Sequence, residues 1–280
     1  MCVQIISIRT SNMTTTTSVP DLLNAAVVIL RPDASQESRH QATNYLTHFI
    51  RNDEGSLGAL INLLSSGVLM KTDVLTSFEL DGVKSLIGGM FYKRCKDGRY
   101  MNQDVSVNMT VDAINATIQY EQSLYIENQT GNMSLFGAQM CASRCVIAVH
   151  QYSTLDVDKM GPLEVLLNLC LMPYLAAKRS LQVDKQLYSP ITALEILAAL
   201  SNEMEHGSFL TMKQAKILQQ QCKDVVLSCV QSAFDLVASR IKGDEIWCAN
   251  SYGLGVGALK VLGYVHAHLT QYVWIYNLYF

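Results

Sequence analysis

The sequence predicts an all-α protein, and three observations support this fold class. Only 16 glycines and 5 prolines interrupt 280 residues, which is too few for the frequent turns of an all-β sandwich. Apolar side chains recur instead at the three- and four-residue spacing of helices through most of the chain. Hydrophobic residues make up 49% of the chain, so it has enough apolar surface to fold and is not disordered.

The charge balance and the hydropathy pattern exclude two classes of partner. The 21 basic and 24 acidic residues give a formal net charge of −3 without any block of like charges, so we expect no direct nucleic-acid binding. Polar residues interrupt every apolar run before it reaches the roughly 18 residues that a membrane-spanning helix needs, so we expect no membrane insertion. The apolar opening "MCVQIISIRT" is too short for a secretory signal.

The first elements are predicted from their start and stop signals. Residues 1–18 end in a polar run of Ser and Thr, which we expect to be a disordered tail. A first helix is predicted to begin at Pro20 and to end before Pro32, because proline suits the first turn of a helix and cannot continue one. Asp33 or Ser35 is placed to cap a second helix that ends near Asn52.

A third and a fourth helix follow the same logic. Asp53 is predicted to cap the third helix, which residues 65–67 close, and apolar spacing predicts the fourth helix over residues 77–94. The fourth helix contains a Gly88-Gly89 pair. Each glycine costs about 1 kcal/mol relative to alanine inside a helix. We therefore expect a neighbouring helix to approach closely at these glycines.

The remaining chain continues as helical segments joined by short polar loops. Pro173 lies inside one of them, where it is expected to kink the helix without ending it. The predicted segments are 105–126, 134–152, 162–179, 190–205, 211–241 and 244–272. Helix pairs starting near residues 20, 54, 103, 161 and 209 fit a degenerate repeat of roughly 40–47 residues with inserted loops. The pattern predicts an elongated, right-handed α-solenoid of about five to six HEAT-like helical hairpins.

Two stretches resemble importin-β-type (karyopherin-β) nuclear transport receptors. The run "LLNAAVVILRPDASQESRHQATNYLTHFI" is similar to the N-terminus of that family. The pair "TALEILAALSNEMEH" and "GALKVLGYVHAHL" is similar to its transportin-3/importin-13-like branch. This chain departs from the family at Ser56-Leu57, at Ser201 and at Gly263-Tyr264-Val265, where Ala-Trp, Pro and Gly-Ser-Trp are usual.

The resemblance implies a domain division and a function. It places importin N-terminal-like HEAT repeats 1–3 over residues 19–152 and further HEAT-like repeats over 153–280, where the aromatic ending "YVWIYNLYF" suggests a C-terminal truncation. Receptors of this family are not enzymes and shuttle between nucleus and cytoplasm. They bind the GTPase Ran in its GTP form, protein cargo and Phe-Gly nucleoporins. A HEAT-type scaffold that assembles a complex without Ran is the alternative.

One basic cluster is the candidate partner-binding site. The cluster lies at the end of the fourth helix and could meet an acidic surface, such as that of Ran; its members are Lys93, Arg94, Lys96 and Arg99. The alternative is a solvated helix end whose cations complement the helix dipole.

Other motifs point to packing and predict no catalytic, cofactor-binding or metal residues. Cys141 and Cys145 are four residues apart without a second ligand pair, and we expect packed thiols in a reduced compartment. "GLGVGALK" at residues 253–260 lacks the preceding strand of a phosphate loop, so its small residues predict close helix packing. His150 is expected in a core or groove. No Asp-Asp-x-x-Asp motif of an isoprenoid-type enzyme occurs.

Overall fold

The computed structural model describes residues 19–52, 55–70, 75–98, 107–127, 132–154, 161–178, 188–206, 209–242 and 253–262. All regular structure in these ranges is helical, so the predicted all-α class is confirmed. No helix in the described part of the chain is long and apolar enough to cross a membrane. The predicted tail at 1–18, the candidate residue Arg99 and the aromatic ending lie outside the described residues.

The observed helices match the predicted segments closely. Residues 253–262 are also helical, within the predicted 244–272 segment. The named elements are α1 (Val19–Leu30), α2 (Gln36–Asn52), α3 (Ser56–Ser65), η1 (Val68–Met70), α4 (Ser77–Lys96), α5 (Val107–Glu127), α6 (Leu135–Ser153), α7 (Pro162–Lys178), α8 (Pro190–His206) and α9 (Met212–Lys242). Pro173 lies inside α7 and does not end it.

Side chains satisfy the helix ends at the α1–α2 turn. Ser35, rather than Asp33, caps α2, because its Oγ accepts a hydrogen bond from the Ser38 N–H at 3.1 Å. Arg39 donates from Nη2 to the carbonyl oxygens of Arg31 and Pro32 at 2.8 and 2.7 Å. These carbonyls follow directly after α1, in the turn to α2, where the Arg31 oxygen also accepts from the Ala34 N–H at 3.3 Å. One arginine of α2 therefore holds the turn that follows α1.

The start of α4 carries a capping box. Thr76 Oγ1 accepts from the Glu79 N–H at 3.2 Å, and the Glu79 carboxylate accepts from the Thr76 N–H at 3.0 Å. Glu79 also pairs with Arg31 at 3.2 Å, which joins α4 to the end of α1. The Thr-x-x-Glu spacing is a sequence signal for such a cap.

Glu79 is expected to make part of the stability sensitive to acid. Hydrogen bonds from the Thr76 backbone and side chain, together with Arg31, hold the pKa of Glu79 below its ordinary value. A carboxyl with a lowered folded-state pKa stabilises the fold above its unfolded pKa, and this contribution is lost as the pH falls through the folded pKa. Glu79→Gln should therefore lower the unfolding free energy at neutral pH. It should also make the fall in unfolding free energy below about pH 4 smaller than in the wild type.

Urea midpoints at neutral and acidic pH measure this effect. Glu164→Gln, which removes an exposed carboxylate on α7, is the matched control and should leave the difference between the two pH values as in the wild type. If the urea midpoint falls equally between neutral and acidic pH in Glu79→Gln and in the wild type, Glu79 does not contribute to the acid sensitivity as proposed.

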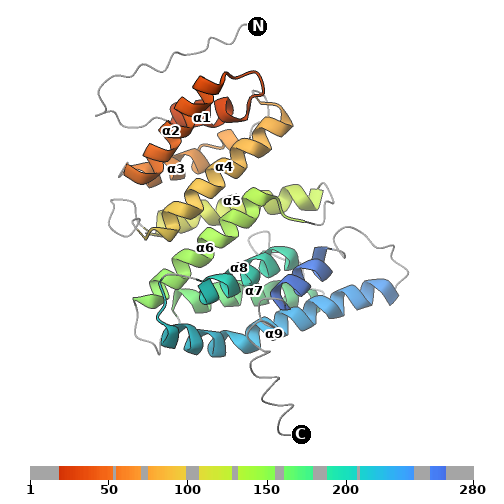
Figure 1. The fold of residues 1–280 in the computed structure, drawn as a ribbon. Coiled ribbons are helices and arrows are strands. Elements are labelled where there is room, and N and C mark those ends of the chain that lie inside the picture. The colour runs from red at the N-terminus through yellow and green to blue at the C-terminus, as the bar shows by residue number, and fades with distance from the viewer. Residues whose placement is uncertain are drawn as a thin grey trace, which may run out of the picture.

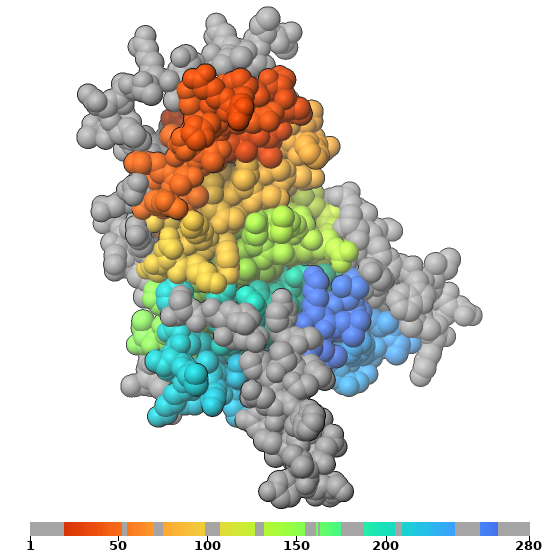
Figure 2. Space-filling model, in the orientation of Figure 1, coloured from red at the N-terminus to blue at the C-terminus, as the bar shows by residue number. Residues whose placement is uncertain are grey.

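The helices pack within hairpins and between adjacent hairpins. The most extensive contacts join α4 to α6 and α6 to α8, and α3 contacts α5 as α7 contacts α9. Hairpin partners also pack, as α1 does on α2, α5 on α6 and α7 on α8. The chain descends from α1 (red) to α9 (light blue) in Figure 1, and these segments form successive bands in Figure 2, whereas residues 253–262 (dark blue) lie above α9 in both views. One continuous hydrophobic cluster runs from Leu22 to Val261.

Gly88 and Gly89 meet different surroundings on α4. A Cβ added at Gly88 would lie 2.8 Å from Cδ2 of the Phe136 ring and 2.2 Å from Oε1 of Gln139, both on α6. The expected close approach is therefore confirmed at Gly88. At Gly89 the nearest such atom is the Gln139 Nε2 at 3.4 Å, which is an ordinary contact.

Alanine at these two positions should have opposite effects. We expect Gly88→Ala to lower the unfolding free energy by about 1–3 kcal/mol, because it overpacks the α4–α6 interface. Gly89→Ala should raise it by about 0.5–1 kcal/mol through better helix propensity. Urea denaturation of the two variants checks the prediction, and a change of the same sign in both would contradict it.

Candidate functional site

The structure distributes the predicted basic cluster over different environments. Lys93 is exposed on α4, whereas Arg94 is buried with 2% of its surface exposed. The Lys96 side chain is 35% exposed and forms an ion pair with Glu203 of α8. Arg99 lies outside the described residues. Of the three described members, Lys93 alone is exposed.

Lys96 belongs to a small polar network with Tyr92 and Glu203. The Tyr92 hydroxyl donates to Glu203 Oε1 at 2.5 Å, and Lys96 Nζ lies 3.6 Å from the same oxygen. Lys96 Nζ also donates to the Tyr92 hydroxyl at 3.3 Å. Burial and the hydrogen bond to Glu203 raise the pKa of Tyr92, so its hydroxyl stays protonated and acts as a donor at neutral pH.

The end of α4 packs on two stacked rings, those of His150 and Phe209, at Gly98. Gly98 has a φ of +67°, a left-handed conformation that favours glycine after a helix. A Cβ at Gly98 would lie 3.2 Å from ring carbons of both His150 and Phe209. These two rings stack with centroids 4.1 Å apart and an interplanar angle of 7°. His150 is half-buried, as predicted, and burial lowers its pKa.

A second polar site lies inside the molecule between α4 and α5. Lys84 Nζ donates to Glu121 Oε1 at 2.9 Å, and the two side chains are only 6% and 3% exposed. Ser134, the N-cap of α6, donates from Oγ to the other carboxylate oxygen at 2.5 Å. Lys84 Nζ also lies 5.4 Å from the centre of the Tyr120 ring, within reach of a cation–π interaction. Both oxygens of the buried carboxylate are therefore hydrogen-bonded.

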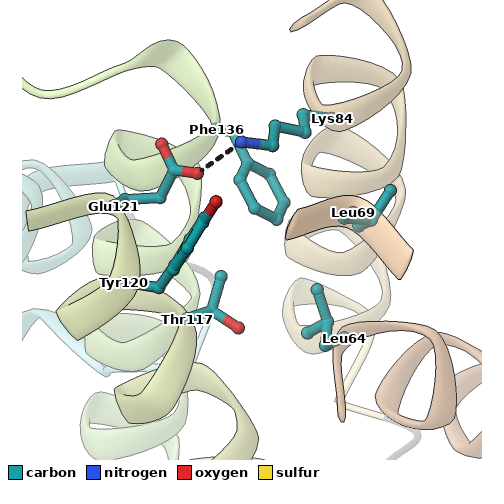
Figure 3. A pocket seen from close by; sticks show the side chains of 7 residues that line it. All are labelled: Leu64, Leu69, Lys84, Thr117, Tyr120, Glu121 and Phe136. Atoms are coloured by element: carbon teal, nitrogen blue, oxygen red, sulfur yellow. Dashed lines mark hydrogen bonds and ion pairs between the residues drawn. The ribbon is translucent and has the colours of Figure 1, made fainter. Parts of the chain in front are cut away.

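A small cavity adjoins this ion pair (Figure 3). Its volume of about 10 Å³ holds roughly one water molecule. Small-molecule sites usually measure hundreds of Å³, so the cavity has no room for a substrate or a cofactor. Its lining comes from η1, α3, α4, α5 and α6, namely Leu64, Leu69, Lys84, Thr117, Tyr120, Glu121 and Phe136.

The thiols of the described region are packed groups. Cys141 and Cys145 of α6 are both buried, as the sequence predicts. Burial raises the pKa of both thiols, so they are protonated at neutral pH and are weak nucleophiles. Among the described residues, no group of three or more His, Cys, Asp or Glu could hold a metal ion.

The glycine-rich segment at residues 253–262 is helical. A Cβ added at Gly257 would lie 3.0 Å from Leu194 Cδ1 of α8, whereas nothing lies within 4 Å of one at Gly255. The predicted close packing of small residues is confirmed at Gly257. This segment contributes buried surface through Leu254, Ala258 and Val261.

The N-terminus of α8 is held by hydroxyl and amide groups of α5. Gln122 Oε1 accepts from the Ser189 N–H at 2.6 Å and from Thr192 Oγ1 at 2.8 Å. The Tyr125 hydroxyl is hydrogen-bonded to the Ser189 hydroxyl. Ser189 Oγ in turn accepts from the Thr192 N–H at 3.2 Å and caps α8. The network ties two hairpins together, and sequence periodicity gives no signal for it.

Comparison with protein-family models, with curated proteins and with solved structures finds no match to the chain. The geometry described above contains buried polar links between helices and one exposed cation at the end of α4. Its polar groups hold helices to one another.

Proposed function

We propose that the chain is an importin-like segment of a nuclear transport receptor, which binds Ran in its GTP form and takes part in the import of protein cargo. The observation that carries this proposal is the order of helix packing. The substantial contacts join helices of the same hairpin, as in α5 on α6, or of adjacent hairpins, as in α4 on α6 and α6 on α8. Stacked helical hairpins pack in this order, because each repeat contacts only its neighbours.

In this proposal the hairpins form the right-handed solenoid that the sequence predicts. The helices α4, α6 and α8, each the second of its pair, follow one another along one side of the stack. The resemblance to importin-type receptors assigns Ran to the inner helices of the first pairs, cargo largely to later pairs and Phe-Gly nucleoporins to outer faces. A protein of this kind shuttles between cytoplasm and nucleus.

Lys93 is the basic residue that best fits a contact with an acidic partner such as Ran. It is exposed near the end of α4, which belongs to the second pair. Arg94 is buried, and Lys96 is engaged with Glu203, so these two residues support the position of α4 instead.

Capture on immobilised Ran tests the proposal. We expect Ran loaded with a non-hydrolysable GTP analogue to capture the chain and Ran loaded with GDP to capture much less. Lys93→Glu should weaken the capture about fivefold, the size of a single exposed charge pair at its upper range of about 1 kcal/mol. Lys223→Glu, at an exposed position on α9, is the matched control and should bind as the wild type.

The other outcomes are equally informative. Failure of GTP-loaded Ran to capture the chain, in an assay where a known importin binds, would contradict the proposed function. Equal capture with both nucleotides would also contradict it, and would point to the alternative of a HEAT-type scaffold that works without Ran.

A further inference from the structure

One polar link joins two helices that share little direct packing. Helices α4 and α8 both pack extensively on α6. Among the described residues, the backbones of α4 and α8 have little direct contact with each other. Tyr92 and Lys96 of α4 nevertheless reach Glu203 of α8, which is 111 positions from Tyr92. We call these three residues the α4–α8 strap.

The strap crosses α6, which lies between α4 and α8 and packs on both (Figure 1). Val146 and Val149 of α6 have no exposed surface. The strap therefore spans the middle helix of a three-helix layer from one flank to the other.

The carboxylate at the centre of the strap has two unequal oxygens. Oε1 of Glu203 accepts from Tyr92 at 2.5 Å and pairs with Lys96 at 3.6 Å. Oε2 is buried and has no hydrogen-bond partner, although the residue is only 2% exposed. A buried carboxylate oxygen without a donor is unfavourable relative to water. Closing the strap thus gains two charge-assisted contacts and gives up the hydration of one oxygen.

We propose that the strap is a releasable lock between α4 and α8, the two helices that flank α6. When it is closed, it sets the separation of α4 and α8. When α4 and α8 spread, Glu203 regains water on both oxygens, which offsets part of the lost contacts. The layer therefore has a closed and an open arrangement that differ by the state of one carboxylate. This inference concerns the mechanics of the fold and does not depend on Ran binding.

The distance between α4 and α9, which packs on α8, reports the state of the strap. Spin labels can be attached through azido amino acids at Asp81 and Lys223, which are exposed on α4 and α9, so that no cysteine is altered. Pulsed electron–electron double resonance then gives the distribution of distances between the two labels. We expect Tyr92→Phe/Lys96→Met to widen this distribution about twofold or to shift its centre outward, because the layer gains its open arrangement.

A matched control separates the strap from ion pairs in general. Lys260 pairs with Glu195 of α8 at 2.7 Å, between α8 and the adjacent helical segment 253–262, so Glu195→Gln breaks a pair that spans no third helix. It should leave the distribution unchanged. If the double variant loses helical content, the distance distribution of the single variant Tyr92→Phe is the test, because this variant removes one hydroxyl and keeps the ring. Unchanged distributions in the folded strap variants, or equal widening in Glu195→Gln, would overturn the proposal.

Discussion

Lys84→Met is expected to lower the unfolding free energy by about 3–5 kcal/mol, the usual cost of removing one partner of a buried ion pair. The Lys84 and Glu121 side chains are 6% and 3% exposed, so bulk water has little access to the place of the lost ammonium group. The variant leaves Glu121 buried with Ser134 as its remaining donor of the two described above. Urea denaturation followed by circular dichroism measures the loss.

Two further variants separate the ion pair from the packing around it. Lys84→Met/Glu121→Leu replaces both charges by apolar groups and should recover most of the stability, because no charge is left unpaired. Lys223→Met removes an exposed lysine from α9 and should change stability by less than about 0.5 kcal/mol. A Lys84→Met variant as stable as Lys223→Met would show that the buried pair does not form.

Phe91→Ala is expected to cost about 3–5 kcal/mol, because it opens a cavity in the core. Phe91 of α4 has no exposed surface and belongs to the continuous hydrophobic cluster. Phe78 lies on the same helix with 77% of its surface exposed, so Phe78→Ala should cost less than about 0.5 kcal/mol. The same denaturation experiment compares the two, and equal losses would show that the assigned face of α4 is wrong.

Local signals predicted the helices well because these helices begin and end at residues with strong preferences. Pro20 lies in the first turn of α1, Pro32 follows the end of α1, and Ser35 directly precedes α2. The third helix begins at Ser56, after Gly55, and the predicted cap Asp53 lies outside the described residues. Apolar periodicity was sufficient to predict the later helices, because each of them buries one apolar face.

The polar contacts between hairpins could not be predicted in the same way. Lys84 and Glu121 are 37 positions apart, and Tyr92 and Glu203 are 111 apart, so no local spacing relates them. Arg94 is the instructive case. It lies three and seven positions after Phe91 and Ile87, both of which are fully buried, so helical spacing already places it on the apolar face. The prediction that Arg94 is a surface cation like Lys93 is therefore wrong, because Arg94 lies on the buried face of α4.

Hydrogen exchange of the chain alone and with Ran, read by mass spectrometry, is the most direct test of the proposed function. Binding to the inner helices of the first pairs should slow exchange in peptides of α2, α4 and α6 when Ran carries a GTP analogue. Peptides of α9 should exchange at the same rate in both conditions, and GDP-loaded Ran should leave all peptides as in the chain alone. No slowing in any peptide, or the same slowing with both nucleotides, would contradict the account.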